Sequence, residues 1–265
     1  MQISGATRLL GLIGDPVVQA RTPGMANQLL QQQQQFGRFV VIPCHVKPEG
    51  LSGFVQALRI LQNFDGAVVT MPHKASMAAL VDELTPEARL VGAVNVIRRY
   101  PDGRLHGTVL DGEGFVRGLL EAGHSVLGKR CVLVGAGGAA SAIAFALARH
   151  GCGSLYLLNR TESKAISLCS RLRQVFPAIS IEASVPPDGP VDIAINGTNL
   201  GMKADDPLPM SEALVERSEL VAECVIAPEM TRLLELAKAK KQKIHTGVPM
   251  LAAQLKMMLS FMGVD

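Results

Sequence analysis

The sequence predicts an α/β protein of two lobes, each built on a sheet of mostly parallel strands. Short apolar runs alternate with helical stretches along the chain, and a second alternation of the same kind starts at Gly128. Glycine makes up 26 of the 265 residues without any low-complexity segment. An average protein contains only ~7% glycine, so we expect a fold in which backbones approach each other closely.

The overall composition excludes several classes of protein. Apolar residues make up 48% of the chain and charged residues 18%, which is typical of a chain with a substantial core and excludes a disordered protein. The net charge is only +3 and aromatic residues are 4% of the chain, so neither a basic surface nor stacking platforms for nucleic acid are expected. We interpret the lysines at 238–243 as a solvated helix end.

The cysteines and the first residues indicate the cellular compartment. The five cysteines are scattered and odd in number, and no C-x-x-C pair is present, which excludes a disulfide framework and an obvious metal site. The start, MQISGATRLL, lacks the features of a signal peptide. The charge-free stretch 131–148 is broken by glycines, so we expect a strand, a turn and a helix there rather than a membrane span. These features predict a cytoplasmic protein without metal, nucleic-acid or membrane contact, and they leave monomer and homodimer open.

The first alternation supplies the elements of the N-terminal lobe. An apolar run ends in Gly14-Asp15-Pro16, as a buried strand does when it enters a loop. Thr22 and Pro23 are a good N-cap and first residue for a helix. The expected elements are strands at 9–14, 38–46 and 65–70, helices at 22–35 and 48–61, and a helix opened by residues 72–74.

The second alternation supplies the other lobe. The expected elements are strands at 131–134, 154–158, 179–183, 191–196, 220–225 and 243–246, and helices at 138–150, 162–176 and 249–262. We expect the last helix to return to the first lobe. The predicted domains are therefore residues 1–112 with 246–265, which would bind the substrate, and residues 113–245.

A glycine-rich turn marks residues 113–245 as a dinucleotide-binding domain. Gly135-Ala136-Gly137-Gly138-Ala139-Ala140 follows a strand and opens a helix, which is the context that the G-x-G-x-x-G/A pattern requires. Gly135 permits a tight turn, Gly137 admits a pyrophosphate, and the helix N-terminus offers free N–H groups. We predict cofactor contacts from Gly135, Ala136, Gly137, Gly138 and Ala139, with an ordinary tight turn as the alternative.

The end of the next strand indicates which nicotinamide cofactor fits. NAD-binding domains carry Asp or Glu there to bind the ribose 2′-hydroxyl. This chain instead has Asn159-Arg160-Thr161, followed by Lys164. Because a guanidinium pairs well with phosphate, we predict NADP rather than NAD, with these four residues at the cofactor. The alternative is that Arg160 and Lys164 belong to a solvated helix start.

Seven motifs follow one another over nearly the whole chain. The motifs are Gly66-Ala-Val-Val-Thr70-Met-Pro72-His-Lys74, Gly92-Ala-Val-Asn95-Val-Ile97, Gly107-Thr-Val-Leu-Asp111-Gly-Glu-Gly-Phe115, the Gly135 turn, Asn159-Arg160-Thr161, Asn196-Gly-Thr198-Asn-Leu-Gly201-Met202 and Gly247-Val-Pro-Met-Leu-Ala-Ala-Gln254. In this order they resemble the motifs of the shikimate dehydrogenase family. The resemblance implies a substrate-binding domain, a Rossmann-type NADP-binding domain, and reversible oxidation of shikimate to 3-dehydroshikimate in the chorismate pathway of aromatic amino acid biosynthesis.

The resemblance also implies roles for individual residues. Lys74 and Asp111 match the catalytic pair of the family, and this agrees with the chemistry. Oxidation of an alcohol needs a base for the hydroxyl proton while hydride leaves the same carbon, and an aspartate can orient the lysine. The other implied roles are substrate binding by Thr22, Thr70, Asn95 and Gln254, and cofactor binding by Thr198 and Gly247.

Several elements depart from the family pattern. The S-x-S-P element that holds the substrate carboxylate reads Ala20-Arg21-Thr22-Pro23, so one hydroxyl is missing. Losing one donor to an anion removes about 1.5–3 kcal/mol of hydrogen bonding, unless Arg21 turns inward and replaces it. The D-x-V-Y element reads Glu223-Cys-Val-Ile226. We therefore predict a divergent paralogue that keeps the chemistry. The alternatives are that it oxidises quinate or another hydroxylated ring carboxylate, or that it is a catalytically weak metabolite or dinucleotide sensor.

Overall fold

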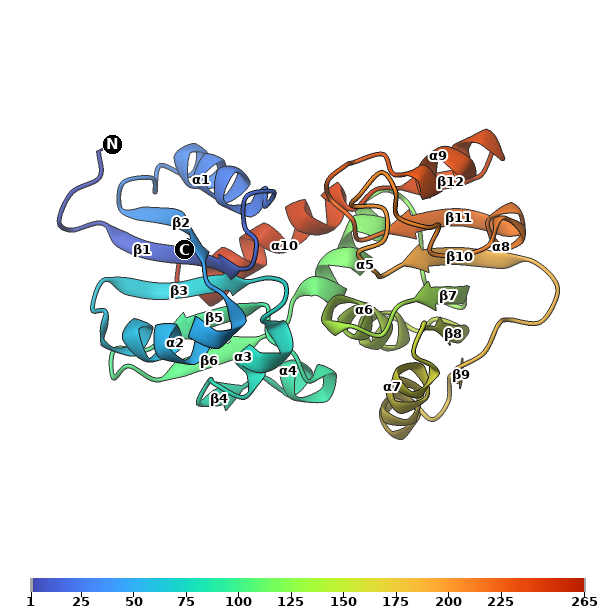
Figure 1. The fold of residues 1–265 in the computed structure, drawn as a ribbon, viewed down its shortest axis with the longest axis horizontal. Helices are drawn as coiled ribbons and strands as arrows, with labels where there is room; N and C mark the ends of the chain where they lie inside the picture. The colour runs from blue at the N-terminus through green and yellow to red at the C-terminus, as the bar shows by residue number, and fades with distance from the viewer. Residues whose placement is uncertain (1, 265) are drawn as a thin grey trace. The chain divides into compact units, whose positions relative to one another are not determined.

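The chain forms two compact units, each with its own sheet (Figure 1). The computed structural model describes residues 2–264. One unit comprises the chain up to Leu110 together with the segment from Leu255 onward, and the other is Asp111–Gln254. Both sheets have six strands, and helices connect most of them. The two-lobed α/β fold predicted from the sequence is confirmed.

The sheet of the first unit has the order β2-β1-β3-β5-β6-β4. Its strands are β1 (Arg8–Gly14), β2 (Phe39–His45), β3 (Phe64–Val69), β4 (Glu83–Leu84), β5 (Val96–Arg99) and β6 (Leu105–Thr108). Its helices are α1 (Thr22–Gln32), α2 (Leu51–Ile60) after a 3-10 turn at Pro48–Gly50, α3 (Lys74–Ala78) and α4 (Pro86–Val91). β1 runs parallel to β2 and β3, whereas β5 is antiparallel to β3 and β6, so the sheet is mixed.

The helix expected over 22–35 ends earlier. α1 stops at Gln32, and Gln34 adopts a left-handed backbone with φ 58°. The backbone N–H groups of Gln35 and Phe36 both donate to the carbonyl of Leu30 and close the helix end. The glutamine run therefore predicted too long a helix, because the turn back to β2 requires the chain to leave the helix before the run is complete.

The sheet of the second unit is parallel throughout and has the order β12-β11-β10-β7-β8-β9. Its strands are β7 (Arg130–Val134), β8 (Ser154–Leu158), β9 (Ser180–Glu182), β10 (Val191–Asn196), β11 (Ser218–Glu223) and β12 (Lys243–His245). Its helices are α5 (Asp111–Glu121), α6 (Gly138–Arg149), α7 (Glu162–Val175), α8 (Glu212–Glu216) and α9 (Arg232–Ala239), and α10 (Val248–Phe261) begins in it. This is the doubly wound order of dinucleotide-binding domains, in which the direction of winding reverses between β7 and β10.

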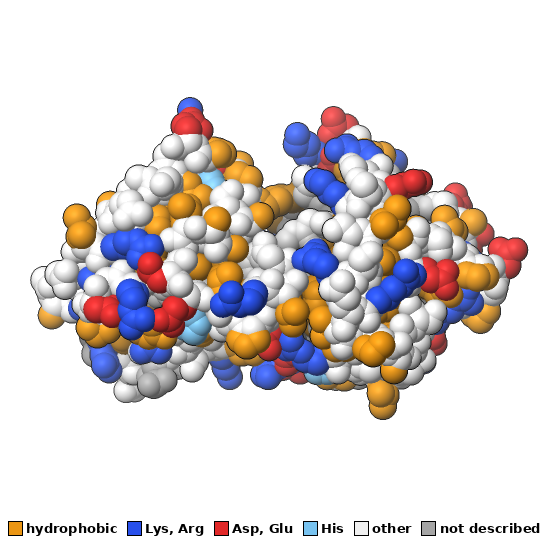
Figure 2. Space-filling model, turned by 90° about the horizontal axis from the view of Figure 1, so that it is seen from below, with side chains coloured by type: hydrophobic (Ala, Val, Ile, Leu, Met, Phe, Trp, Pro, Cys, Tyr) orange, Lys and Arg blue, Asp and Glu red, His pale blue; other side chains and the backbone are white. Residues whose placement is uncertain are grey.

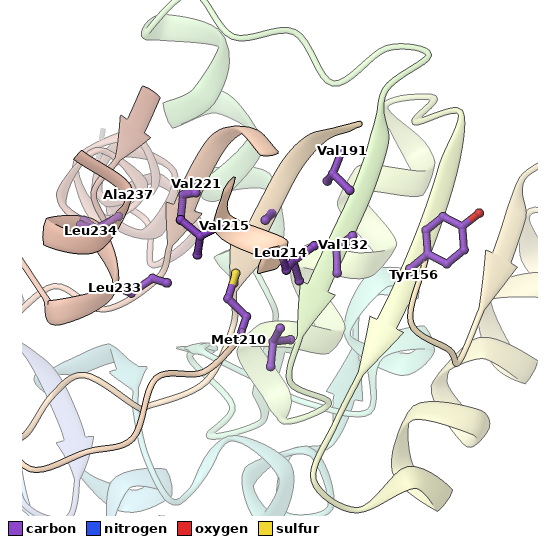
Figure 3. Close-up of a cluster of buried hydrophobic side chains, with 12 residues drawn as sticks. Val132, Tyr156, Val191, Met210, Leu214, Val215, Val221, Leu233, Leu234 and Ala237 are labelled. Carbon is purple, nitrogen blue, oxygen red and sulfur yellow. The ribbon is translucent and has the colours of Figure 1, made fainter. Parts of the chain in front are cut away.

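A buried cluster holds α8 and α9 against this parallel sheet (Figure 3). Val132 and Val221 contribute from the strands, while Leu214 and Leu234 contribute from the two helices. On α6, every residue from Ala140 to Ala148 is buried. Strands covered on both faces read as continuous apolar runs, which is why the sequence indicates them clearly.

Basic and acidic side chains are mixed on the face that Figure 2 shows. Within the lysine-rich segment near residue 240, Lys240 pairs with Glu216 at 2.6 Å and Lys243 pairs with Glu219 at 2.9 Å. In the described chain, no helix is both long and apolar enough to span a membrane.

Two glycines allow close packing against α10 and against the residue that follows it. On β3, a Cβ placed on Gly66 would lie 2.7 Å from Cγ of Met262, which follows α10. The end of the chain therefore packs on the first sheet, and the predicted return of the last helix is confirmed. On α5, a Cβ on Gly114 would lie 2.8 Å from Cβ of Gln254 on α10.

We expect Gly66→Ala to destabilise the protein by about 1–3 kcal/mol, because the added methyl group overpacks the contact with Met262 and the carbonyl of Ile97. Urea unfolding followed by circular dichroism measures the change. Gly53→Ala is the matched control, since Gly53 is exposed in α2 with open space around it. The free energy of unfolding of this variant should rise by up to about 1 kcal/mol, because alanine favours a helix more than glycine does. Equal stability of the two variants would contradict the close-contact argument.

Candidate active site

Three of the predicted site residues lie at the carboxyl end of β3. Thr70 directly follows this strand, and Lys74 is the first residue of α3. The backbone N–H of Val94 donates to the carbonyl of Lys74 at 2.8 Å, and that of Val69 donates to the carbonyl of Asn95 at 2.7 Å. Backbone pairing thus brings Thr70, Lys74 and Asn95 together at one edge of the sheet.

Asn95 has a structural role at this edge. Its side chain is 1% exposed, and its Oδ1 accepts a hydrogen bond from the backbone N–H of Leu110 at 2.8 Å. Its own N–H donates to the carbonyl of Thr108 at 2.9 Å. The residue after Leu110 is Asp111, so the Asn95 amide fixes the backbone directly before the predicted catalytic aspartate.

The element that departs from the family pattern forms the start of α1. Thr22 is buried, but it is the first helical residue and not the N-cap. Arg21 occupies the N-cap position with a helical backbone and makes no capping hydrogen bond, while its side chain is exposed. The expectation that Thr22 caps the helix is therefore wrong, because the chain becomes helical one residue earlier.

A polar pair that none of the sequence motifs indicates lies at the same edge. His45 ends β2 and its Nε2 lies 2.6 Å from Oδ1 of Asp15, which follows β1. The parallel register sets Gly14 opposite His45, and this register is the signal that could have predicted the pair. His73 is buried, and its Nε2 lies 2.6 Å from the carbonyl oxygen of Val46, so this ring fastens the Pro72 turn to the chain after β2.

In the second unit, the glycine-rich turn lies where the winding of the sheet reverses. Gly135 has φ 120°, which a side chain would strain, and its N–H donates to the carbonyl of Leu158 at 2.7 Å. Gly137 is the N-cap of α6 and has open space around its Cα. No side chain caps α6, so the N–H groups of its first turn can bind an anion.

The polar residues after β8 lie at the same edge. Val134 and Leu158 are paired in register, which places Asn159 beside the glycine turn. Nδ2 of Asn159 donates to the carbonyl of Thr161 at 2.8 Å. Arg160, Thr161 and Lys164 are exposed, so their polar groups remain accessible to a ligand.

A third loop at this edge, the Gly197–Gly201 loop, is folded around Asn196 at the end of β10. Oδ1 of Asn196 accepts from the backbone N–H of Thr198 at 3.0 Å and from its hydroxyl at 2.7 Å. Nδ2 of Asn196 donates to the carbonyl of Leu200 at 2.9 Å and to Oε2 of Glu223 at 3.3 Å. The N–H of Gly197 donates to the carbonyl of Val134 at 2.8 Å, so this loop adjoins the glycine turn.

The remaining predicted residues surround the start of α10. Gly247 is buried, and a Cβ there would meet the carbonyl of Val225. Asp111 begins α5 and is 3% exposed, and Gln254 on α10 is also 3% exposed. Gly114, one helical turn after Asp111, is the point at which the two helices touch, so Gln254 lies close to the first turn of α5.

Within residues 2–264, no group of three or more His, Cys, Asp and Glu side chains is arranged to hold a metal ion. All five cysteines are free thiols. The candidate residues therefore supply hydroxyl, amide and ammonium groups in the first unit, and amide, carboxyl and helix N-terminal N–H groups in the second unit. The first set suits a polyol and the second set suits a dinucleotide.

Comparison with known proteins decides the family. The profile of the shikimate dehydrogenase substrate binding domain matches residues 12–97, and that of shikimate / quinate 5-dehydrogenase matches residues 120–199. A shikimate dehydrogenase (NADP(+)) of Rubrobacter xylanophilus is 39% identical over 272 residues, which cover 100% of this chain and 94% of the relative. The chain belongs to the shikimate dehydrogenase family. The resemblance seen in the motifs is confirmed.

Solved members of the shikimate dehydrogenase family share the fold. A shikimate dehydrogenase crystallised in complex with NADP+ is 31% identical, with a TM-score of 0.89 over 100% of this chain and 93% of the other. A 5-ketofructose reductase of Gluconobacter sp. is 29% identical, with a TM-score of 0.82 over 97% of this chain and 93% of the other. This chain is thus an oxidoreductase of the shikimate dehydrogenase family with a Rossmann domain, and the family uses NADP or NAD.

A hollow of about 560 Å³ lies elsewhere in the first unit, at the amino-terminal ends of β1, β2 and β3. Its lining includes Arg8, which pairs with Asp65, together with Arg38, Arg98 and Arg99. In open α/β sheets, ligands bind at the carboxyl ends of the strands. This hollow is therefore not the active site that a member of the shikimate dehydrogenase family would use.

Two buried side chains, one on β11 and one on β12, have shifted pKa values. Burial raises the pKa of Glu223 to about 7, and the hydrogen bonds from Thr231 and Asn196 oppose the rise. Burial lowers the pKa of His245 to about 4, and the nearby His124 adds to the effect. Both groups are therefore held in their neutral forms over much of the range between pH 4 and pH 7.

We expect the stability of the wild-type protein to fall relative to Glu223→Gln as the pH rises from 4.5, the usual pKa of a glutamate, to about 7, the pKa of Glu223 in the folded protein. In this window the carboxyl is ionised in the unfolded chain but protonated in the folded protein, so about 3 kcal/mol is lost. Urea unfolding at a series of pH values measures the difference. His245→Gln is the control with the opposite sign. The free energy of unfolding of the wild type should rise relative to that of His245→Gln as the pH increases from about 4 to 6.5. Parallel stability curves for wild type and Glu223→Gln would contradict the assignment.

Proposed function

We propose that this protein is an NADP-dependent dehydrogenase that reversibly oxidises a ring hydroxyl of a shikimate-like polyol carboxylate, with shikimate to 3-dehydroshikimate as the reference reaction. The observation that carries the proposal is the backbone pairing that gathers Thr70, Lys74 and Asn95 at one sheet edge, in a chain of this family. We further propose that it acts in the cytoplasm, on the route to chorismate and the aromatic amino acids.

Lys74 and Asp111 are the proposed acid–base pair. In the oxidation, Lys74 in its neutral form takes the proton of the reacting hydroxyl and returns it in the reverse direction. Asp111 orients the lysine and accepts a hydrogen bond from the same hydroxyl. Thr22, Thr70, Asn95 and Gln254 bind the remaining polar groups of the substrate. His45 and Asp15 lie at the same sheet edge as Thr70 and add a second polar pair for that purpose.

The second unit fits a dinucleotide. The uncapped first turn of α6 offers N–H groups to a pyrophosphate, and the open space at Gly137 lets that group approach the backbone. The exposed Arg160 supplies a guanidinium for a 2′-phosphate, with Lys164 beside it, which favours NADP over NAD. When bound, NADP supplies the nicotinamide ring that accepts the hydride.

The start of α1 favours a second candidate substrate. Ala20 supplies no hydroxyl for a carboxylate, and the similar 5-ketofructose reductase acts, by its name, on a ketose. A sugar-like ketone or alcohol without a carboxylate is therefore an alternative substrate. Quinate or another hydroxylated ring carboxylate is the alternative within the class of the reference substrate. The sensor alternative is weaker, because a binding protein has no need for both members of a proton-transfer pair.

Steady-state kinetics of the purified protein test the proposal. Shikimate, quinate and fructose are compared as substrates, each with NADP and with NAD, and 5-ketofructose is tested in the reverse direction. We expect the highest kcat/KM for shikimate with NADP. Lys74→Ala and Asp111→Ala should each lower kcat by about 10²–10⁴-fold, because proton transfer contributes that much, while the Kd for NADPH changes little.

The exposed Lys47 in the same unit provides the matched control, and Lys47→Ala should retain wild-type rates. Near-wild-type turnover by either the Lys74 or the Asp111 variant would reject the assigned roles. If the wild-type protein turns over none of the compounds with either cofactor, the proposed activity itself is wrong.

Restoring the missing hydroxyl tests the substrate assignment. Ala20→Ser should raise kcat/KM for shikimate by roughly tenfold or more, since a donor to an anion contributes about 1.5–3 kcal/mol. The same variant should leave the rate with 5-ketofructose unchanged, because that compound has no carboxylate to bind. An equal change for both compounds would show that position 20 does not face the carboxylate.

A further inference from the structure

Glu223 is a fully buried carboxyl group at the end of β11. Its side chain is 0% exposed, and its hydrogen-bond partners in the described chain are the neutral side chains of Asn196 and Thr231. The second oxygen, Oε1, has no hydrogen-bond partner among the described residues. Burying a carboxyl group without a cation is costly, so this group needs an explanation.

The two partners of Glu223 lie at opposite ends of the Gly197–Gly201 loop. Asn196 precedes the loop and organises it through Thr198 and Leu200. Thr231 packs at its far end, because a Cβ on Gly201 would lie 3.2 Å from Cβ of Thr231. Glu223 therefore connects the beginning and the end of the loop through one carboxyl group.

Thr231 also links Glu223 to α9. The Thr231 hydroxyl donates to the Glu223 carboxyl, and the same oxygen accepts from the N–H of Leu234 at 3.4 Å as the cap of α9. A hydroxyl can make both bonds at once. Cys224, the next residue of the chain, donates from Sγ to the carbonyl of Thr198 at 3.7 Å. The end of β11 thus contacts the loop directly through Cys224, and indirectly through Asn196 and Thr231.

We propose that Glu223 is a positioning residue that clamps the Gly197–Gly201 loop in the shape that binds the cofactor beside the glycine turn. This inference rests on the proposed dinucleotide-dependent activity. It concerns cofactor binding and leaves the proton-transfer pair of the reaction unchanged. The loop belongs to the binding edge because Gly197 donates to the carbonyl of Val134, directly before Gly135.

The neutral form of the carboxyl suits this role. Its carbonyl oxygen accepts from both Asn196 and Thr231, while an ionised group at this depth is stabilised only when the loop opens to water. Burial raises the pKa of Glu223 to about 7. The clamp should therefore weaken above neutrality, and a glutamine, which keeps the carbonyl acceptor, should preserve it at all pH values.

Three other titratable groups, His245, His124 and Asp206, lie near this region. The residue before Glu223 pairs in register with His245, whose pKa lies at about 4, and His124 faces that ring. Asp206 accepts from the N–H groups of Gly201 and Lys203, and Arg232 of α9 donates to the Asp206 carbonyl. A titration of cofactor binding near pH 7 that disappears in Glu223→Gln is therefore assigned to Glu223.

Fluorescence titration with NADPH tests the clamp on the full chain. The chain has no tryptophan, so changes in the nicotinamide emission report binding with little protein background. We expect the wild-type Kd to rise several-fold between pH 6 and pH 8.5, and the Glu223→Gln Kd to stay within about threefold of the wild-type value at pH 6 and to be flat with pH. Glu223→Leu, which leaves both partners unpaired, should raise Kd at least tenfold at pH 6.

Val221→Ala separates positioning from stability. Val221 is fully buried on the same strand and faces the hydrophobic cluster, so this variant loses stability but should bind NADPH like the wild type. If Glu223→Leu does not fold, the pH dependence of the NADPH Kd of Glu223→Gln tests the clamp instead. A Kd that rises with pH as it does in the wild type overturns the clamp. Wild-type-like binding by Glu223→Leu also overturns it. Failure of the wild type to bind NADPH or NADH overturns both the clamp and the proposed function.

Discussion

Close packing at glycine is the constraint on which both units depend. In the first unit, Gly66 lets the segment after α10 reach β3, and in the second, Gly114 lets α10 reach α5. At the point where the winding reverses, a Cβ on Gly135 would lie 3.0 Å from the carbonyl carbon of Gly197. Each of these contacts holds an element that carries a candidate site residue, so the glycine content of the chain reflects the geometry of the site as well as its turns.

Neutral polar side chains fix the loops that these contacts bring together. Asn95 and Asn196 have the same role in different units, since each is buried at a strand end and its Oδ1 accepts a backbone N–H from a following segment. An amide can donate and accept at once without the cost of burying a charge. Glu223 shares this arrangement as a carboxyl group that burial keeps protonated below about pH 7.

Local patterns predict part of this structure well, and contacts distant in sequence account for the rest. The strands of the parallel sheet and the glycine turn are predicted nearly to the residue, because apolar runs and turn glycines are local signals. Helix Asp111–Glu121 is not predicted, since Gly112, Gly114 and Gly118 lower helix propensity, and packing on α6 and α10 overrides that preference. Glu223 and its partner Asn196 are 27 residues apart in sequence. Only the strand order brings them together, and no local pattern encodes it.

The uncapped start of α6 has a consequence for how the protein is stabilised in a cell. Other helices of the second unit, α8 and α9, begin with a side chain that caps the first turn, Ser211 and Thr231 respectively. A cap of this kind contributes about 1 kcal/mol. At α6 a dinucleotide phosphate would take that place, so the ligand completes the helix. Because an unfolded chain offers no such site, the folded fraction would then follow the supply of cofactor.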